Sequence, residues 1–196
     1  MELVFNIKEV LRYMGVRGAA EAPPALVQAA EAAAARVRAL AAPGYHYRAF
    51  ALERAADGIR LAGTAFVLTG AQIQKHLSGC ETAVLLYATL GFAVDREILR
   101  LQGTALSQAL ALDAAACEGL EGLCGAVCAR IQAEFPAFSQ RPRFSPGYAD
   151  LPLAASRGIL ALLDAGRRSG VTLNAGNMMN PTKTVTAIVG LTPKEN

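Results

Sequence analysis

The sequence has no tryptophan, only two histidines and no long uncharged apolar run. Its most apolar stretch, Thr82 to Val94, is shorter than the roughly 18 residues that a membrane-spanning helix requires. The first fifteen residues include acidic side chains and lack the apolar centre of a signal peptide. We therefore expect a cytoplasmic protein with no membrane span and no targeting segment.

Clustered positive charge is also scarce. The chain has 19 basic and 16 acidic residues, and its net charge is only +3. The nearest approach to a cluster is Arg141 and Arg143, followed by Arg167 and Arg168. Nucleic-acid binding needs Lys and Arg gathered on one face, so we expect no nucleic-acid partner.

The sequence also lacks the common catalytic motifs. There is no P-loop, no GxGxxG, no nucleophile elbow and no CxxC pair. His46 and His76 have no neighbour in sequence with which to form a catalytic pair. We identify no catalytic acid, base or nucleophile, and we predict no metal site.

Four cysteines are present, and three of them follow helical spacing. Cys117, Cys124 and Cys128 fall at i, i+7 and i+11, on one side of a helix. A set of thiols facing a metal or a corrinoid is one interpretation, but thiols at this spacing seldom complete a tetrahedral site alone. Small buried thiols, reduced in a cytoplasmic protein, are favoured for these three and for Cys80.

Length and periodicity predict one α+β domain over residues 1–196, in which helices accompany a mainly antiparallel twisted sheet. The predicted helices are 7–14, a Pro-initiated helix to Leu40, 70–78, 93–134 and 155–168, with a break near Gly103 or within Ala114–Gly119. The predicted strands are a hairpin of 45–54 and 57–68, then 80–90, 171–173 and 184–191. Residues 136–154 contain four prolines and are predicted to be irregular.

The loop Arg141–Leu153 is the most informative segment. Its prolines restrict the backbone, and Gly147 permits a tight turn. Arg143 can bind a carboxylate through two N–H groups, and Phe144 and Tyr148 can cover an apolar or purine face. The alternative is a rigid crossover whose aromatic side chains close the core, and loop chemistry alone favours that alternative.

Four segments, in order, resemble the activation domain of cobalamin-dependent methionine synthase, especially its short stand-alone members. Arg143 to Tyr148 matches the family's RxxxGY pattern. The other three segments are LRYMG near the start, LSGCETAVLLYATLGFAVDREI in the middle and NMMNPTKTVTAIVGL near the end. The resemblance extends from Leu11 to Leu191, and it implies the family's α+β fold.

The resemblance also implies a site for S-adenosylmethionine. Arg143 would bind the methionyl carboxylate or the ribose side, the backbone at Phe144 would contact the adenine edge, and Gly147 and Tyr148 would complete the turn against the ligand. Glu121, which follows the family's LDA element, would pair with the ligand's positive charge. The alternative for Glu121 is a solvated helix carboxylate such as Glu118.

Two further positions and the ends of the chain bear on this site. Met178 and Met179 can line a soft apolar wall, although core packing is the favoured interpretation. Lys183 is expected to be a solvated charge at a strand end. Full-length family members have ligand-contacting residues before and after the segments matched here. We therefore expect a more open site, or one that another protein completes.

The function implied by the resemblance is an activation module that acts in trans. It would present S-adenosylmethionine to a corrinoid methyltransferase during reductive remethylation of cobalamin, in a split methionine synthase. The partner protein would carry the cobalamin. Two alternatives remain: a non-catalytic subunit that caps a corrinoid protein without binding S-adenosylmethionine, and a small-molecule enzyme that uses the loop as an anion site.

Overall fold

The computed structural model describes residues 1–18 and 21–194, which form two compact units. The first unit comprises Met1–Gly44, Ala88–Val127 and Asn180–Thr184. The second comprises Tyr45–Tyr87, Cys128–Met179 and the residues from Val185 onward. Among the described residues, none of the helices combines the length and hydropathy that a bilayer crossing requires.

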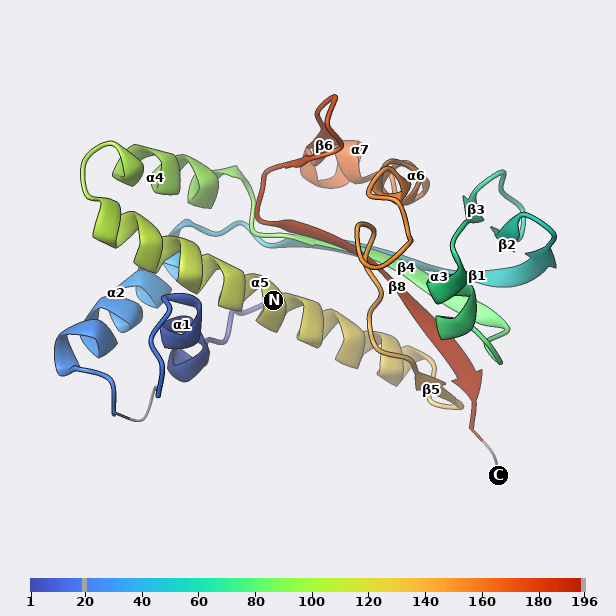
Figure 1. Cartoon of the computed structure of the whole chain (residues 1–196), viewed down its shortest axis with the longest axis horizontal. Helices are drawn as coiled ribbons and strands as arrows, with labels where there is room; N and C mark the ends of the chain where they lie inside the picture. Colours follow the sequence, from blue (N-terminus) through green and yellow to red (C-terminus); the bar gives the residue numbers. More distant parts are fainter. Residues whose placement is uncertain (19–20, 195–196) are drawn as a thin grey trace. The chain divides into compact units, whose positions relative to one another are not determined.

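Helices dominate the first unit (Figure 1). They are α1 (Ile7–Tyr13), α2 (Pro24–Leu40), α4 (Phe92–Gln102) and the part of α5 (Leu106–Glu134) that extends to Val127. Asn6 caps α1 by accepting a hydrogen bond from the N–H of Lys8 at 3.1 Å. Pro24 lies at the start of α2, where its missing N–H costs nothing. The interior face of α2 consists of Ala30, Ala33, Ala34 and Val37.

Small residues on α5 allow the amino-terminal segment to pack closely against it. A Cβ atom added at Gly119 would lie 2.8 Å from the ring of Phe5, and one added at Gly122 would lie 2.9 Å from the carbonyl oxygen of Val4. The N–H of Asn6 donates to Glu118 at 3.2 Å. Residues 4–6 therefore lie directly on the surface of this helix.

A six-stranded sheet with the order β3-β2-β1-β4-β8-β5 forms most of the second unit. Its strands are β1 (Gly44–Ala55), β2 (Gly58–Leu61), β3 (Val67–Leu68), β4 (Thr82–Thr89), β5 (Phe138–Gln140) and β8 (Thr184–Pro193). β1 and β2 form an antiparallel hairpin in which Leu52 lies opposite Leu61. The predicted α+β class with an antiparallel sheet is confirmed.

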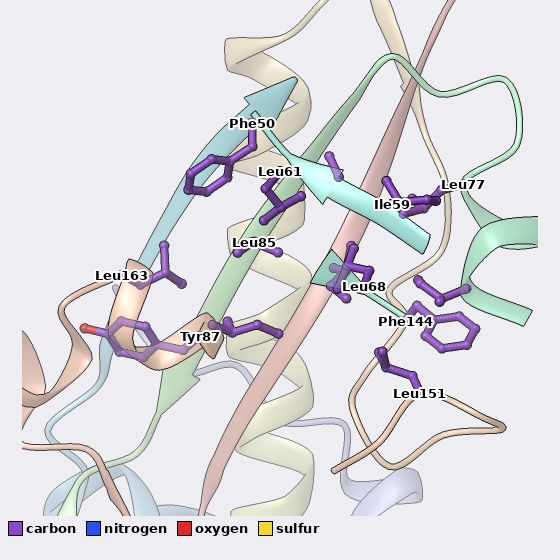
Figure 2. Close-up of a cluster of buried hydrophobic side chains, with 14 of the residues drawn as sticks. Phe50, Ile59, Leu61, Leu68, Leu77, Leu85, Tyr87, Phe144, Leu151 and Leu163 are labelled. Atoms are coloured by element: carbon purple, nitrogen blue, oxygen red, sulfur yellow. The ribbon is translucent and has the colours of Figure 1, made fainter. Parts of the chain in front are cut away.

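Three short helices and a small second sheet complete this unit. The helices are α3 (Ala71–His76), α6 (Ala155–Leu162) and α7 (Ala165–Ser169), and the small sheet pairs β6 (Thr172–Leu173) with β7 (Met179–Asn180). Figure 2 shows the core of the unit, where Leu85 and Tyr87 of β4 lie among Phe50, Leu61 and Leu163. The hydroxyl of Tyr87 is 2.9 Å from the hydroxyl of Ser169, so this buried polar group is satisfied.

Three predictions about the elements need correction. The second hairpin run, 57–68, is divided by a turn, and β3 pairs back on β2. Residues 136–154 are not wholly irregular, because Phe138–Gln140 pair with the last strand. The predicted helix 155–168 is interrupted at Asp164, which adopts a left-handed conformation with φ of 52°. The long helical region breaks at Gly103, one of the two predicted places, and α5 continues through 114–119.

Candidate functional site

The loop Arg141–Leu153 begins as an interrupted continuation of β5 along the edge of β8. Gln140 lies opposite Leu191, and the next paired residue, Phe144, lies opposite Ile188. The loop therefore advances four residues where β8 advances three, so it contains one extra residue, as in a β-bulge. Pro142 falls in this interval and has no N–H to donate. The bulge explains why Arg143 lies in irregular backbone between two paired positions.

A compact turn follows the bulge. The N–H of Tyr148 donates to the carbonyl of Ser145 at 3.1 Å, and the N–H of Gly147 donates to the carbonyl of Leu151 at 2.9 Å. Gly147 has φ of +86°, a conformation in which any residue with a Cβ atom would be strained. Pro146 and Leu151, which both belong to this turn, are buried. The predicted tight turn at Ser145-Pro146-Gly147 is confirmed.

Helix α3 holds the loop at two places. Both carboxylate oxygens of Asp150 accept hydrogen bonds from the first turn of α3, from the N–H of Ala71 at 2.6 Å and from that of Gln72 at 3.1 Å. At the other end of the helix, Nε2 of His76 lies 2.9 Å from the carbonyl oxygen of Pro142. A carboxylate at a helix amino terminus satisfies free N–H groups and matches the helix dipole. Asp150 and His76 therefore position the loop, a role that we did not predict for either residue.

The two aromatic residues of the motif lie in contact but differ in exposure. The ring centroids of Phe144 and Tyr148 are 5.3 Å apart at an interplanar angle of 78°. Phe144 is 6% exposed and belongs to the core, whereas Tyr148 is 67% exposed. Phe144 also lies 5.1 Å from the ring of His76. The buried ring thus supports an exposed one, which leaves a face of Tyr148 open to solvent.

Backbone pairing limits what Phe144 can offer a ligand. Its N–H donates to the carbonyl of Ile188 and its carbonyl accepts from the N–H of the same residue, each at 2.9 Å. A carbonyl oxygen has a second lone pair, whereas an N–H has a single hydrogen. The predicted contact with an adenine edge would therefore have to use the Phe144 carbonyl.

The structure brings four of the five predicted site residues together. Arg143, Phe144, Gly147 and Tyr148 share one loop of the second unit, and Arg143 is half-buried. Glu121 is exposed on α5 in the first unit. Its neighbour Glu118 is half-buried and bonded to Asn6, so Glu118 is not the solvated carboxylate that we expected. Burial is the main cause that raises the pKa of Glu118.

The neighbouring residues Met178 and Met179 lie in different environments. Met178 is 57% exposed, whereas Met179 packs against the core of the second unit. The side chain of Asn174 accepts hydrogen bonds from the N–H groups of Gly176 and Met178, which fixes the turn between β6 and β7. Core packing is confirmed for Met179 alone.

Lys183 is not the solvated charge that we expected. Its side chain is 13% exposed, and Nζ lies 2.8 Å from a carboxylate oxygen of Asp113 and 3.4 Å from Sγ of Cys117. Burial lowers the pKa of Lys183, but hydrogen bonding to Asp113 and the charge interactions outweigh it, so the pKa is raised overall. This ion pair links the residue directly before β8 to α5 within the first unit.

The cysteines occupy several environments. Cys80 and Cys124 are buried, and Cys117 and Cys128 are half-buried. None of the four is part of a disulfide. Over residues 1–18 and 21–194, no three His, Cys, Asp or Glu side chains gather as a metal site would require. The packing interpretation is confirmed for Cys80 and Cys124.

Comparison with solved structures finds a protein with a similar fold. The chain is similar to the crystal structure of the MetH reactivation domain bound to AdoHcy, with a TM-score of 0.71 and 14% sequence identity. The match covers 98% of this chain and 75% of that chain. The two proteins share a fold. No family model matches the sequence, and no curated protein does.

Proposed function

We propose that this protein binds S-adenosylmethionine on the loop Arg143–Tyr148 and acts as an activation module for a corrinoid methyltransferase on another chain. The observation that carries the proposal is the shared fold with a reactivation domain whose structure contains AdoHcy. The loop supports it, because RxxxGY forms an anchored turn with an exposed aromatic ring. A rigid turn binds a ligand with little loss of conformational entropy.

Each side chain of the motif has a physical role in this proposal. Arg143 would hold the ligand carboxylate through parallel N–H donors. Tyr148 would pack its exposed face on the ligand, and Phe144 would hold that ring in place from below. The protein thus binds and orients the methyl donor, and cobalamin on the partner would supply the redox and methyl-transfer chemistry.

Calorimetric titration with S-adenosylmethionine tests the proposal. We expect binding by the wild-type chain, and a loss of about tenfold or more in affinity for Arg143→Ala and for Tyr148→Ala. Arg60→Ala, an exposed arginine on β2, serves as the charge control and should bind as the wild type does. Circular dichroism would verify that each variant is folded.

The titration also separates the two leading functions. Repeating it with a corrinoid-binding methyltransferase module allows for a site that the partner completes. If no heat of binding appears with the isolated chain or with the mixture, the ligand assignment is wrong. A complex that forms with the corrinoid protein but ignores S-adenosylmethionine would instead favour the non-catalytic cap.

A further inference from the structure

A separate pocket lies in the first unit, and none of the residues that line it belongs to the RxxxGY loop. It has a volume of about 650 Å³ and is formed by α2, α4 and the first turns of α5. Small-molecule sites commonly have volumes of roughly 300–1,000 Å³ and mostly apolar walls with a few convergent polar groups. This pocket therefore has the size of a ligand site.

Its walls are apolar on most sides. Leu26 and Ala29 come from α2, Leu101 from α4, and Leu110 and Ala111 from α5. Leu110 is 61% exposed although it borders the pocket, and Leu26 is 37% exposed. Exposing large apolar side chains to water at an open concavity is unfavourable. Binding of an apolar ligand that covers them is therefore favourable.

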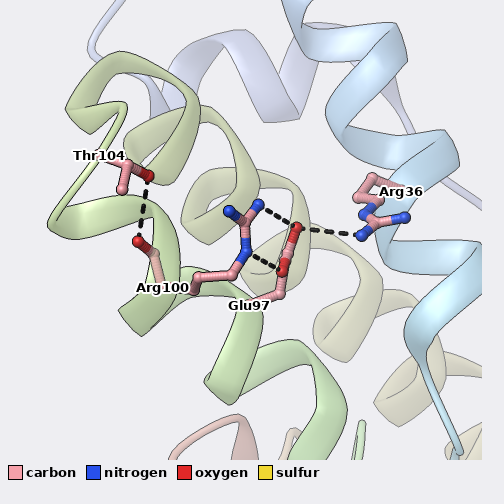
Figure 3. Close-up of polar contacts among 4 residues, drawn as sticks. All are labelled: Arg36, Glu97, Arg100 and Thr104. Carbon is pink, nitrogen blue, oxygen red and sulfur yellow. Dashed lines mark hydrogen bonds and ion pairs between the residues drawn. The ribbon is translucent and has the colours of Figure 1, made fainter.

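One cluster of charged side chains in the lining carries excess positive charge. Glu97 of α4 accepts two hydrogen bonds from Arg100, at 2.8 and 3.0 Å, and one from Arg36 of α2 at 3.1 Å (Figure 3). These three are the charged residues in the lining, so two guanidinium groups share one carboxylate. Hydrogen bonding to Arg100 is the main cause that lowers the pKa of Glu97 to about 2, so the carboxylate is ionised at neutral pH.

The arginines retain capacity for a second anion. A guanidinium has five N–H donors, and Arg36 gives one of them to Glu97. The side chains of Arg36 and Arg100 are 53% and 60% exposed, whereas that of Glu97 is 12% exposed. Glu97 therefore orients both guanidinium groups from the protein side, and their remaining donors are open to a ligand.

We infer that this pocket binds a small amphipathic carboxylic acid, whose apolar chain lies against α2 and α5 and whose carboxylate meets Arg36 and Arg100. The excess of one positive charge selects an anion, and the apolar walls select a hydrophobic chain. The pocket shares no residue with the proposed S-adenosylmethionine site, so an experiment can reject either proposal without affecting the other.

Calorimetric titration with decanoate tests this inference, with decanol as the uncharged ligand of the same chain length. Decanoate should bind, and decanol should bind about tenfold or more weakly, as expected for the loss of a charge-assisted hydrogen bond. Arg36→Gln removes the excess charge but keeps the Glu97–Arg100 pair, and it should weaken decanoate to the level of decanol. Arg96→Gln, an exposed arginine of α4 outside the lining, should leave binding unchanged.

A second pair of variants tests the location. Ala32 of α2 lines the pocket and Ala35 is exposed on the same helix outside the lining. Ala32→Phe should fill the pocket and abolish decanoate binding, whereas Ala35→Phe should not. Equal affinity for decanoate and decanol, binding that survives Ala32→Phe, or no binding of decanoate to the folded wild-type chain would overturn the inference.

Discussion

The side chain of Asp150 ties the candidate loop to the first turn of α3. We predict that Asp150→Ala lowers the free energy of unfolding by about 1 kcal/mol, because α3 loses the acceptor for two N–H groups of its first turn. Urea denaturation monitored by circular dichroism measures this change. Glu31→Ala, an exposed carboxylate of α2, should change stability by less than about 0.5 kcal/mol.

The same variant connects stability to the proposed site. With Asp150 removed, the turn Ser145–Leu151 is held at one end only, so S-adenosylmethionine affinity should fall although residue 150 is outside the RxxxGY motif. Unchanged affinity together with lost stability would show that the anchoring by α3 has no part in binding.

At the residue scale, the sequence predicted local backbone conformation better than it predicted the environments of side chains. The turn at Gly147 followed from local conformational preferences, which the adjacent residues determine. The environments of Lys183, Asp150 and Glu118 did not follow, because their partners are distant in sequence. Asp150, for example, bonds to residues 78 and 79 positions away. No local pattern marks such a pair.

At the scale of elements, two glycines give opposite predictions. A Cβ atom at Gly190 of β8 would lie 2.7 Å from Sγ of Cys80 and 2.8 Å from a methyl carbon of Leu77, so Gly190→Ala should cost about 1–3 kcal/mol. Gly125 of α5 is exposed and has no atom within 4 Å of the added Cβ. Gly125→Ala should therefore stabilise the chain by about 0.5–1 kcal/mol.

Thermal or urea unfolding of both variants measures this contrast. The Gly190 change should also disturb the start of the candidate loop, since the carbonyl of Gly190 accepts from the N–H of Arg141 at 2.8 Å. If Gly190→Ala proved as stable as the wild type, the close packing of Gly190 against Leu77 and Cys80, in the connection from α3 to β4, would be wrong.

The link between α2 and α4 predicts a pH dependence. The folded state lowers the pKa of Glu97 from 4.5 to about 2, chiefly through Arg100. A carboxylate with a lowered pKa stabilises the fold above its unfolded pKa and loses that contribution as the pH falls through its folded pKa. The Glu97 contribution should therefore disappear between about pH 4.5 and pH 2.

Urea unfolding over this pH range, compared with Glu97→Gln, isolates the effect. The variant should be less stable than the wild type at pH 7, and the difference between them should shrink as the pH falls through the window. Glu31→Gln serves as the control and should follow the wild type throughout. A difference between Glu97→Gln and wild type that stays constant with pH would contradict the assignment.

Element positions were largely predictable because turn and helix signals are local. Pro24 marked the start of α2, Gly170 marked the end of α7, and Gly103 marked one of two possible breaks. The strand β5 was not predictable from its own residues, since four nearby prolines indicated irregular backbone. Its pairing depends on the edge that β8 provides.

At the scale of the whole molecule, the α+β class followed from the order of elements, and the fold agrees with that of the MetH reactivation domain. The strand order β3-β2-β1-β4-β8-β5 was beyond sequence reasoning, because β4 and β8 are paired across about a hundred residues. The site prediction depended on the resemblance, since loop chemistry by itself favoured a structural crossover.

Chemical-shift mapping of the backbone amides during titration with AdoHcy would show whether the loop Arg143–Tyr148 binds the ligand. We predict saturable shifts concentrated in residues 143–149 and in the adjoining α3, with little change around Leu110 and Ala111 in the first unit. Shifts confined to other parts of the chain, or a spectrum that stays unchanged at saturating AdoHcy, would contradict it.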